Sequence, residues 1–128
     1  MIIDNIPLDV PVSKRKKISL NLNVYRNLHY QLNNKAKREM KQIIKNCCKD
    51  GCIPCLPICL IYTIYRKTKK RADIMNIGAV LDKFVSDALV EIGLIPDDNT
   101  DVIKKVTFID GGIDKNKPHA RLEIKGYI

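Results

Sequence analysis

Residues 57–66, PICLIYTIYR, have the composition of a buried β-strand, and the rest of the fold can be built outward from them. Isoleucine, tyrosine and threonine dominate the segment, and such branched and aromatic side chains favour extended backbone. Pro57 marks its beginning, and the basic run RKTKKR, residues 66–71, marks its end. We therefore predict a strand in the core of the protein that ends in a basic turn.

Two stretches on either side of this strand have the period of amphipathic helices. Between His29 and Asp50, apolar residues recur every three or four positions and form one stripe: Leu32, Ala36, Met40, Ile43 and Cys47. A second helix is predicted between Asn76 and Ile92, with Gly93 as its stop signal. Its stripe consists of Ile77, Val80, Leu81, Phe84, Ala88 and Ile92. Each stripe is expected to pack on the strands.

Other segments carry strand or loop signals. Residues 6–11 are predicted to be a short edge strand, because prolines limit them. Residues 19–30 carry mostly non-helical signals. Two further strands are predicted at residues 104–109 and 120–126, joined by a turn-rich loop, residues 110–119.

The length of the chain and the order of its elements define the expected fold class. With 128 residues, of which 45% are hydrophobic, the chain can build one hydrophobic core. The elements predict an α+β fold: a single domain, residues 1–128, with a small mixed β-sheet and two main helices packed on one face. The longest apolar run is 14 residues with two prolines, shorter than the roughly 18 to 20 residues of a membrane span. We therefore expect a soluble protein that is not exported.

Charge is distributed unevenly along the chain. Residues 1–72 contain 16 Lys/Arg and 4 Asp/Glu, a net charge of +12, whereas residues 73–128 contain 7 and 10, a net charge of −3. A basic surface is typical of proteins that bind the phosphate backbone of nucleic acids. The predicted DNA contacts are Lys14, Arg15, Lys16, Lys17, Arg26, Lys37, Arg38, Lys41, Arg66, Lys67, Lys69, Lys70 and Arg71.

Three aspartates flank the second predicted helix. Asp73 precedes it, and Asp97 and Asp98 follow it in the stretch LIPDDNTD, residues 94–101. A helix of about 17 residues is roughly 25 Å long, so these carboxylates can converge only if the loop after the helix folds back. Convergent carboxylates beside a basic surface suit Mg²⁺-dependent phosphodiester hydrolysis. The alternative is structural, with Asp73 as a helix cap and the other two as turn formers.

The segment KKRADIMN…DKFVSDALVEIGLIPDDNTDVI, residues 69–103, resembles the RusA family of Holliday-junction resolvases, small phage and prophage endodeoxyribonucleases. The similar features are a basic run before an aspartate, DIMN where the family has Asp-Leu-Asp-Asn, a helical lysine followed by DAL, and DD after a hydrophobic turn. Residues 19–27 look like the family's amino-terminal substrate-facing loop. The resemblance implies a phage- or prophage-encoded homodimer in the bacterial cytoplasm that resolves four-way junctions by paired nicks.

The resemblance also implies a site. It implies that a carboxylate cluster binds Mg²⁺, for which Mn²⁺ can substitute, and that a lysine takes part in catalysis. The corresponding carboxylates are Asp73, Asp97 and Asp98, and the corresponding lysine is Lys83. The chain departs from the family at Met75, which stands where the family has its second acid. A thioether is a poor ligand for Mg²⁺, so one metal ligand is missing. Asp82 or Asp87 could replace the lost acid if the helix is rotated, with Asp82 preferred, and Asn76 could supply a carbonyl oxygen.

Two functions therefore stay open. The first is a Mg²⁺-dependent structure-specific endonuclease that hydrolyses the phosphodiester backbone of branched DNA. The second is a catalytically decayed protein of the same fold that still binds DNA junctions. Met75 favours the second function, whereas the three aspartates and Lys83 favour the first.

Five cysteines suggest reduced thiols rather than a disulfide framework. Four of them are closely spaced, and they include a single CxxC: Cys48, Cys52, Cys55 and Cys59. A confident zinc site has paired CxxC motifs, and free cysteine commonly behaves as a small buried hydrophobe. We therefore expect core thiols here, with zinc as the alternative.

Overall fold

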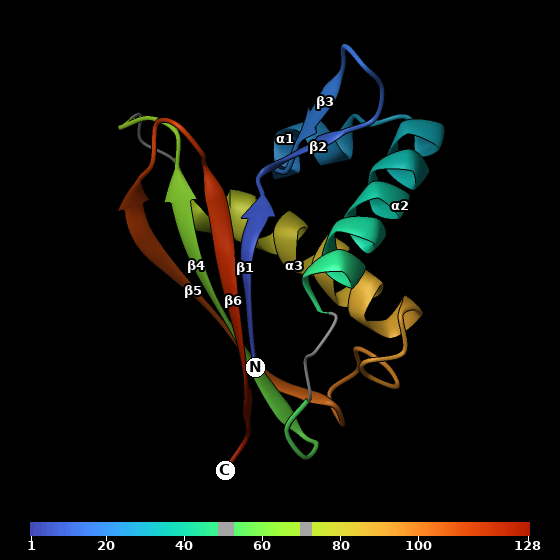
Figure 1. Cartoon of the computed structure of the whole chain (residues 1–128), viewed down its shortest axis with the longest axis vertical. Coiled ribbons are helices and arrows are strands. Elements are labelled where there is room, and N and C mark those ends of the chain that lie inside the picture. The colour runs from blue at the N-terminus through green and yellow to red at the C-terminus, as the bar shows by residue number, and fades with distance from the viewer. Residues whose placement is uncertain (49–52, 70–72) are drawn as a thin grey trace.

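The computed structural model describes residues 1–48, 53–69 and 73–128. Its main layer is a four-stranded mixed sheet with the order β1 (Ile2–Pro7), β6 (His119–Gly126), β4 (Ile58–Arg66) and β5 (Ile103–Ile113). The two long helices, α2 (Tyr30–Cys47) and α3 (Ile74–Glu91), lie on the same face of this sheet (Figure 1). The predicted α+β fold, with a mixed sheet and two main helices on one face, is confirmed.

Strand β4 is the interior strand predicted for residues 57–66. It pairs in parallel with β5 and antiparallel with β6. Every second side chain, from Ile58 to Ile64, is fully buried against the helices, whereas the side chains between them are partly exposed on the opposite face. The period of two thus gives the strand a helix-covered face and an open one.

Helix α3 begins and ends where its sequence signals predict, within two residues. The Asp73 side chain accepts a hydrogen bond from the backbone N–H of Met75 and so caps the first turn. After the helix, Gly93 has a φ of 83°, a conformation that glycine adopts without strain. Gly78 lets the helix lie directly on β5, because a Cβ at this position would come within 2.6 Å of the Phe108 ring.

Helix α2 differs in part from its predicted stripe. Ala36 and Met40 are buried as expected, but Ile44 completes the buried face. Cys47, predicted to belong to the stripe, is exposed. The helix ends at Cys47, and the predicted residues 49 and 50 lie outside the described part of the chain.

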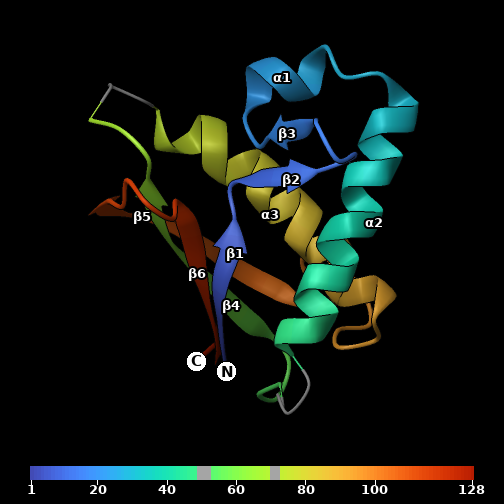
Figure 2. The same ribbon diagram turned by 45° about the horizontal axis from the view of Figure 1, so that its top comes forward.

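The amino-terminal region contains more structure than its sequence predicts. The predicted strand at residues 6–11 is confirmed only in part: residues 6–7 belong to β1, and residues 9–11 form β2 (Asp9–Pro11), which makes a separate hairpin with β3 (Lys17–Ser19). Residues 19–30 are not simply non-helical, since α1 (Leu22–Arg26) begins at Asn21, whose side chain accepts a hydrogen bond from Val24 N–H. This hairpin and α1 lie beyond the end of β1, beside the start of α2 (Figure 2).

The carboxyl-terminal strands are longer than predicted. Strand β5 continues to Ile113, through four of the ten residues predicted to be a loop, because Asp110, Gly112 and Ile113 pair with β4, with a register shift between Asp110 and Gly112. In the described ranges, no helix combines the length and the apolar character that crossing a membrane requires.

Candidate functional site

A surface groove of about 680 Å³ lies where the end of β4, the start of α3 and the base of the β2–β3 hairpin meet. Among the residues that line it are Asp9 from the hairpin, Asp73 and Asn76 from the start of α3, and Arg66 and Lys67 from the end of β4. Oxygen ligands and basic groups therefore share one concave surface, which is the arrangement that binding a metal-associated phosphate requires.

The local structure holds the acidic side of the groove in place. Asp73 is exposed, and one of its carboxylate oxygens is 2.9 Å from the N–H of Met75. Asn76 follows one turn later on α3, so its side chain lies above that of Asp73 on the same side of the helix. Asp9 lines the groove because β2 begins just beyond the end of β1, although Asp9 and Asp73 are 64 residues apart in the chain.

The basic side of the groove comes from the turn that follows β4. Arg66 is the last residue of that strand, and its guanidinium lies 3.4 Å from a carboxylate oxygen of Asp110 on β5. Lys67 and Lys69 are exposed after it. Lys70 and Arg71, also predicted to contact DNA, lie outside the described residues.

Asp97 and Asp98 do not join Asp73 within one chain. They follow α3, whose 18 residues make it about 27 Å long, and the groove is at its other end. The Asp97 side chain accepts hydrogen bonds from the N–H of Asp98, at 2.7 Å, and from the side chain of Asn99, at 3.0 Å. The predicted convergence with Asp73 is therefore wrong for a single chain, because these bonds fold the loop upon itself.

Asp82, the preferred replacement for the lost acid, faces the sheet. One of its oxygens accepts hydrogen bonds from the Tyr62 hydroxyl at 2.8 Å and the Ser86 hydroxyl at 2.9 Å. Burial raises the pKa of Asp82; the two hydroxyl donors lower it, and the negative charges of Asp98 and Asp87 raise it. Burial, followed by the charge of Asp82, also raises the pKa of Tyr62, so its hydroxyl stays a donor. The charge of Asp98 therefore acts on Asp82, which does not line the Asp73 groove.

Two other predicted residues on α3 do not line the groove. Lys83 is exposed and lies ten residues after Asp73, about 15 Å along the helix. Asp87 lies 3.2 Å from Lys37 and so links α3 to α2. The acid that accompanies Asp73 is instead Asp9, which the sequence did not single out. Only pairing of distant segments brings it there, and nothing in its local sequence indicates that position.

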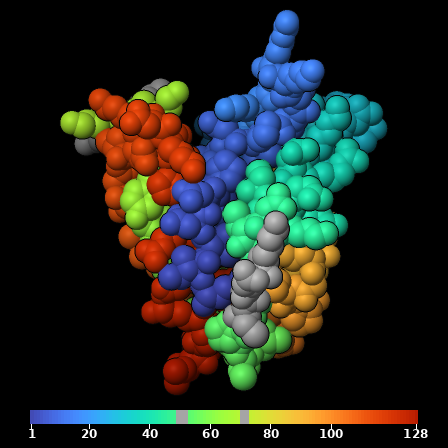
Figure 3. Space-filling view, in the orientation of Figure 1, coloured from blue at the N-terminus to red at the C-terminus, as the bar shows by residue number. Residues whose placement is uncertain are grey.

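The predicted DNA contacts divide into two groups. Lys14, Arg15, Lys16 and Lys17 are all exposed on the β2–β3 hairpin, which projects from the top of the molecule (Figure 3). On α2, by contrast, two of the predicted contacts are engaged with α3: Lys37 with Asp87, and Lys41 with Glu91 at 3.4 Å.

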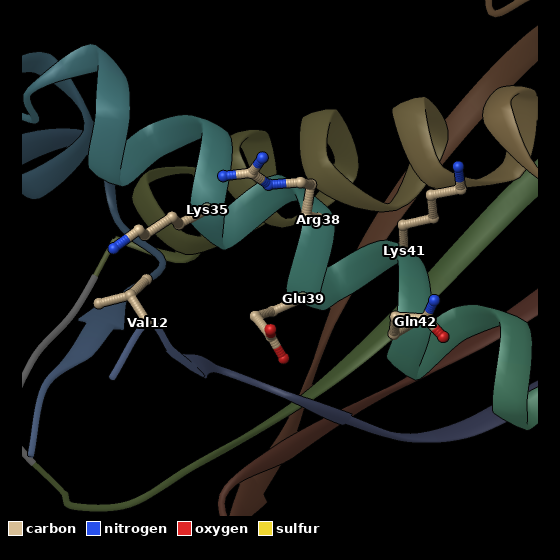
Figure 4. A pocket seen from close by; sticks show the side chains of 6 residues that line it. All are labelled: Val12, Lys35, Arg38, Glu39, Lys41 and Gln42. Atoms are coloured by element: carbon tan, nitrogen blue, oxygen red, sulfur yellow. The ribbon is translucent and has the colours of Figure 1, made fainter. Parts of the chain in front are cut away.

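The outer side of α2 remains basic. Together with Val12 of the hairpin, it lines a shallow groove of about 430 Å³ in which Lys35 lies beside Val12 and Arg38 follows along the helix (Figure 4). Arg26 is exposed at the end of α1, close in sequence to the start of α2. Glu39 lies in the same groove, so one carboxylate interrupts the basic groups of the hairpin and of α2.

The cysteines do not form the buried cluster that was expected. Cys55 is exposed, while Cys48 and Cys59 are only partly buried. Burial, with a contribution from Cys47, raises the pKa of the Cys48 thiol to about 11, which opposes the thiolate form that zinc binds. Cys52 lies outside the described residues, so the four thiols are not described as a set.

In the part of the chain that the structure describes, no group of three or more His, Cys, Asp or Glu side chains is arranged to hold a metal ion. No protein-family model matches the chain, and no curated protein matches its sequence.

Proposed function

We propose that this protein is a Mg²⁺-dependent endodeoxyribonuclease that binds branched DNA and hydrolyses its phosphodiester backbone at the Asp73 groove. The observation that carries the proposal is the composition of that groove, where oxygen side chains lie beside Arg66 and Lys67. Guanidinium and ammonium groups bind phosphate, and oxygen ligands suit Mg²⁺. The resemblance of residues 69–103 to the RusA resolvases supports four-way junctions as the substrate.

The groove fits Mg²⁺ better than a softer metal. Its described lining residues include oxygen side chains and neither thiol nor imidazole. Mg²⁺ in nucleotide-processing sites commonly takes one or two carboxylates, keeps several waters and binds substrate phosphate. Asp73 and Asp9 would hold the ion, with the Asn76 carbonyl as a further oxygen. Once bound, the ion supplies an activated water and stabilises the leaving oxygen.

The chain's own residues position the DNA. Lys67 and Arg66 attract a phosphate to the groove, and the hairpin lysines attract the flanking backbone. The cap bond from Met75 N–H fixes the orientation of the Asp73 carboxylate, so little rearrangement is needed when the phosphate arrives. Met75 itself is 51% exposed and is not needed as a ligand, because Asp9 provides the second carboxylate.

We also propose a homodimer formed through β5. This strand is the outer edge of the sheet, and its exposed apolar side chains include Val106 and Ile109 (Figure 1). Its charge pattern is self-complementary, since lysines occupy its beginning and Asp110 lies near its end. Antiparallel pairing with a second copy brings these opposite charges together. The other edge strand, β1, has six residues against eleven in β5, so it offers a shorter edge for pairing.

Such a dimer gives the Asp97–Asp98 pair a catalytic role. Helix α3 runs opposite to β4, so the Asp73 groove and the Asp97–Asp98 loop lie at opposite ends of one protomer's sheet. Antiparallel pairing of two β5 strands places the loop of one protomer at the same end as the groove of its partner. We propose that each site combines Asp73 of one protomer with the Asp97–Asp98 loop of the other.

Mixing two inactive variants tests this arrangement. Asp73→Asn keeps the helix cap, because asparagine is a good cap residue, and Asp98→Asn keeps a residue acceptable in a turn. We expect each variant alone to lose Mg²⁺-dependent cutting of a four-way junction while binding it at least as tightly as wild type. A mixture should regain part of the activity, because mixed dimers contain one site with both wild-type carboxylate groups.

The result separates three possibilities. If the mixture stays inactive while both single variants are inactive, the site lies within one protomer or the two ends do not cooperate. If Asp98→Asn cuts normally, the Asp97–Asp98 pair only forms the loop. If the wild-type protein binds junctions without cutting them at any Mg²⁺ or Mn²⁺ concentration, the decayed junction-binding protein is the correct function. Single-turnover rates from denaturing gels provide the measurement.

A further inference from the structure

Tyr30, the first residue of α2, carries an aromatic ring that is largely exposed. Its side chain is 66% exposed, the highest fraction among the exposed aromatic residues of the described chain. The ring stacks on the imidazole of His29, with the two centroids 4.7 Å apart and the planes inclined by 30°. His29 covers one face of the Tyr30 ring, and the exposure of Tyr30 leaves much of the ring open to solvent.

Hydrogen bonds hold both rings in place. His29 caps α2, and its Nδ1 accepts a hydrogen bond from the N–H of Gln31 at 3.3 Å. The side-chain amide of Gln31 lies 3.5 Å from the Tyr30 hydroxyl and can donate to it. A ligand that stacks on Tyr30 therefore meets a ring that is already oriented, and it loses little conformational freedom on binding.

The surroundings of this pair are basic. Lys35 follows Tyr30 along α2 by about 7.5 Å, rotated by about 140° around the helix axis, and lies beside Val12 of the hairpin (Figure 4). Arg26 is exposed four residues before Tyr30, at the end of α1. The hairpin adds its four consecutive basic residues. A strand of nucleic acid whose phosphates follow these charges is led past the exposed ring.

We propose that Tyr30, backed by His29, is a stacking site for an unpaired nucleobase of the DNA that binds along the hairpin and α2. Every base has an aromatic face, and stacking on a protein ring adds affinity without requiring a particular sequence. Paired bases inside a duplex do not offer that face, so the site favours single-stranded or branched DNA. This inference rests on the nucleic-acid binding in the proposed function and is independent of the hydrolysis.

Binding in EDTA, where no metal-dependent cutting occurs, tests the stacking site. The probes are a fluorescein-labelled single-stranded oligonucleotide and a duplex of the same sequence, measured by anisotropy. We expect Tyr30→Ala to weaken single-strand binding by about 5- to 150-fold and duplex binding by less than about twofold. Tyr30→Phe, the matched control, should bind like wild type. The slope of log affinity against log salt should not change in Tyr30→Ala, because no charge is lost.

Two outcomes would overturn the stacking site alone: Tyr30→Ala weakening both probes equally, or Tyr30→Phe losing as much affinity as Tyr30→Ala. Thermal melts of all three proteins show whether each variant is folded, and Lys35→Ala provides a folded comparison that lowers the salt slope. A wild-type protein that binds neither probe nor a four-way junction would overturn the proposed function as well. Failure of the stacking site and failure of the function are thus distinguishable.

Discussion

Asp82 is a carboxylate whose surroundings on α3 give it a structural role. It accepts hydrogen bonds from Tyr62, which is fully buried in the sheet, and from Ser86 one turn later on the same helix. Both donors are hydroxyl groups, and no cation among the described residues is paired with it by a salt bridge. The network joins α3 to the sheet through polar groups that satisfy one another.

The raised pKa of Asp82 predicts a pH dependence of stability. Because burial raises this pKa, the folded protein binds the proton more tightly than the unfolded chain does. The free energy of unfolding should therefore fall as the pH rises from about 4, the ordinary pKa of aspartate, to the raised value. Asp82→Asn keeps an oxygen acceptor and removes this titration. We expect the unfolding free energy of Asp82→Asn minus that of wild type to increase with pH across this interval.

Urea denaturation at a series of pH values measures this difference. Tyr62→Phe serves as a second variant, because it removes a hydrogen bond that lowers the pKa of Asp82 and should extend the interval to higher pH. A difference between Asp82→Asn and wild type that stays constant with pH would show that Asp82 does not titrate abnormally in the folded protein.

Among the elements, the β2–β3 hairpin presents its basic residues to solvent, whereas two lysines of α2 form ion pairs with α3. The N–H of Val12 donates to the carbonyl of Lys16 at 2.9 Å and closes the hairpin, so its tip presents Lys14 and Arg15 to solvent. Each phosphate contact that is lost should flatten the slope of log affinity against log salt by about 0.9 for duplex DNA. We expect Lys14→Gln combined with Arg15→Gln to flatten it by about 1.8, measured by anisotropy between low and moderate salt.

The matched control is Lys37→Gln combined with Lys41→Gln. These lysines form ion pairs with Asp87 and Glu91 on α3, at 3.2 and 3.4 Å. Both pairs are partly exposed, so each contributes on the order of 0.2 to 1 kcal/mol to the stability of the helix packing. We expect this variant to lower stability slightly and to change the salt slope less than the hairpin variant. An equal change in both slopes would mean that α2 contacts DNA as extensively as the hairpin.

For the whole molecule, the free edge of β5 predicts a self-associating protein. Ile109 lies near the middle of that strand, on the open face of the sheet, and is 44% exposed. A lysine there would place a positive charge on the proposed interface in both copies, and like charges on an edge strand oppose pairing. We expect Ile109→Lys to shift sedimentation from dimer to monomer at micromolar concentration and to abolish junction cutting.

Ile2→Lys is the control for this prediction. Ile2 is similarly exposed, at 48%, but it lies on β1, the other edge strand. We expect Ile2→Lys to remain a dimer. A wild-type protein that sediments as a monomer with and without junction DNA would contradict the dimer, and dimeric Ile109→Lys would place the interface elsewhere on the surface.

The sequence by itself determined the main elements and the basic character of the surface. Alternating side chains define β4, a period of three to four residues defines α2 and α3, and Gly93 ends α3. These signals are local, because each depends on the backbone geometry of neighbouring residues. The structural roles of Asp73 as a helix cap and of the Asp97–Asp98 pair as loop formers also depend on neighbouring residues alone. The sequence predicted these roles as the alternative to a metal site.

Only the tertiary structure decided which side chains meet. The length of α3 separates Asp73 from Asp98, while the packing of the hairpin beside the start of α3 brings Asp9 to the groove. The rotation of α3 on the sheet turns Asp82 toward Tyr62 and Asp87 toward Lys37. Each of these positions depends on packing between segments far apart in sequence. Such contacts are set by the register of the strands and the close approach of helix to sheet, which no local pattern of residues specifies.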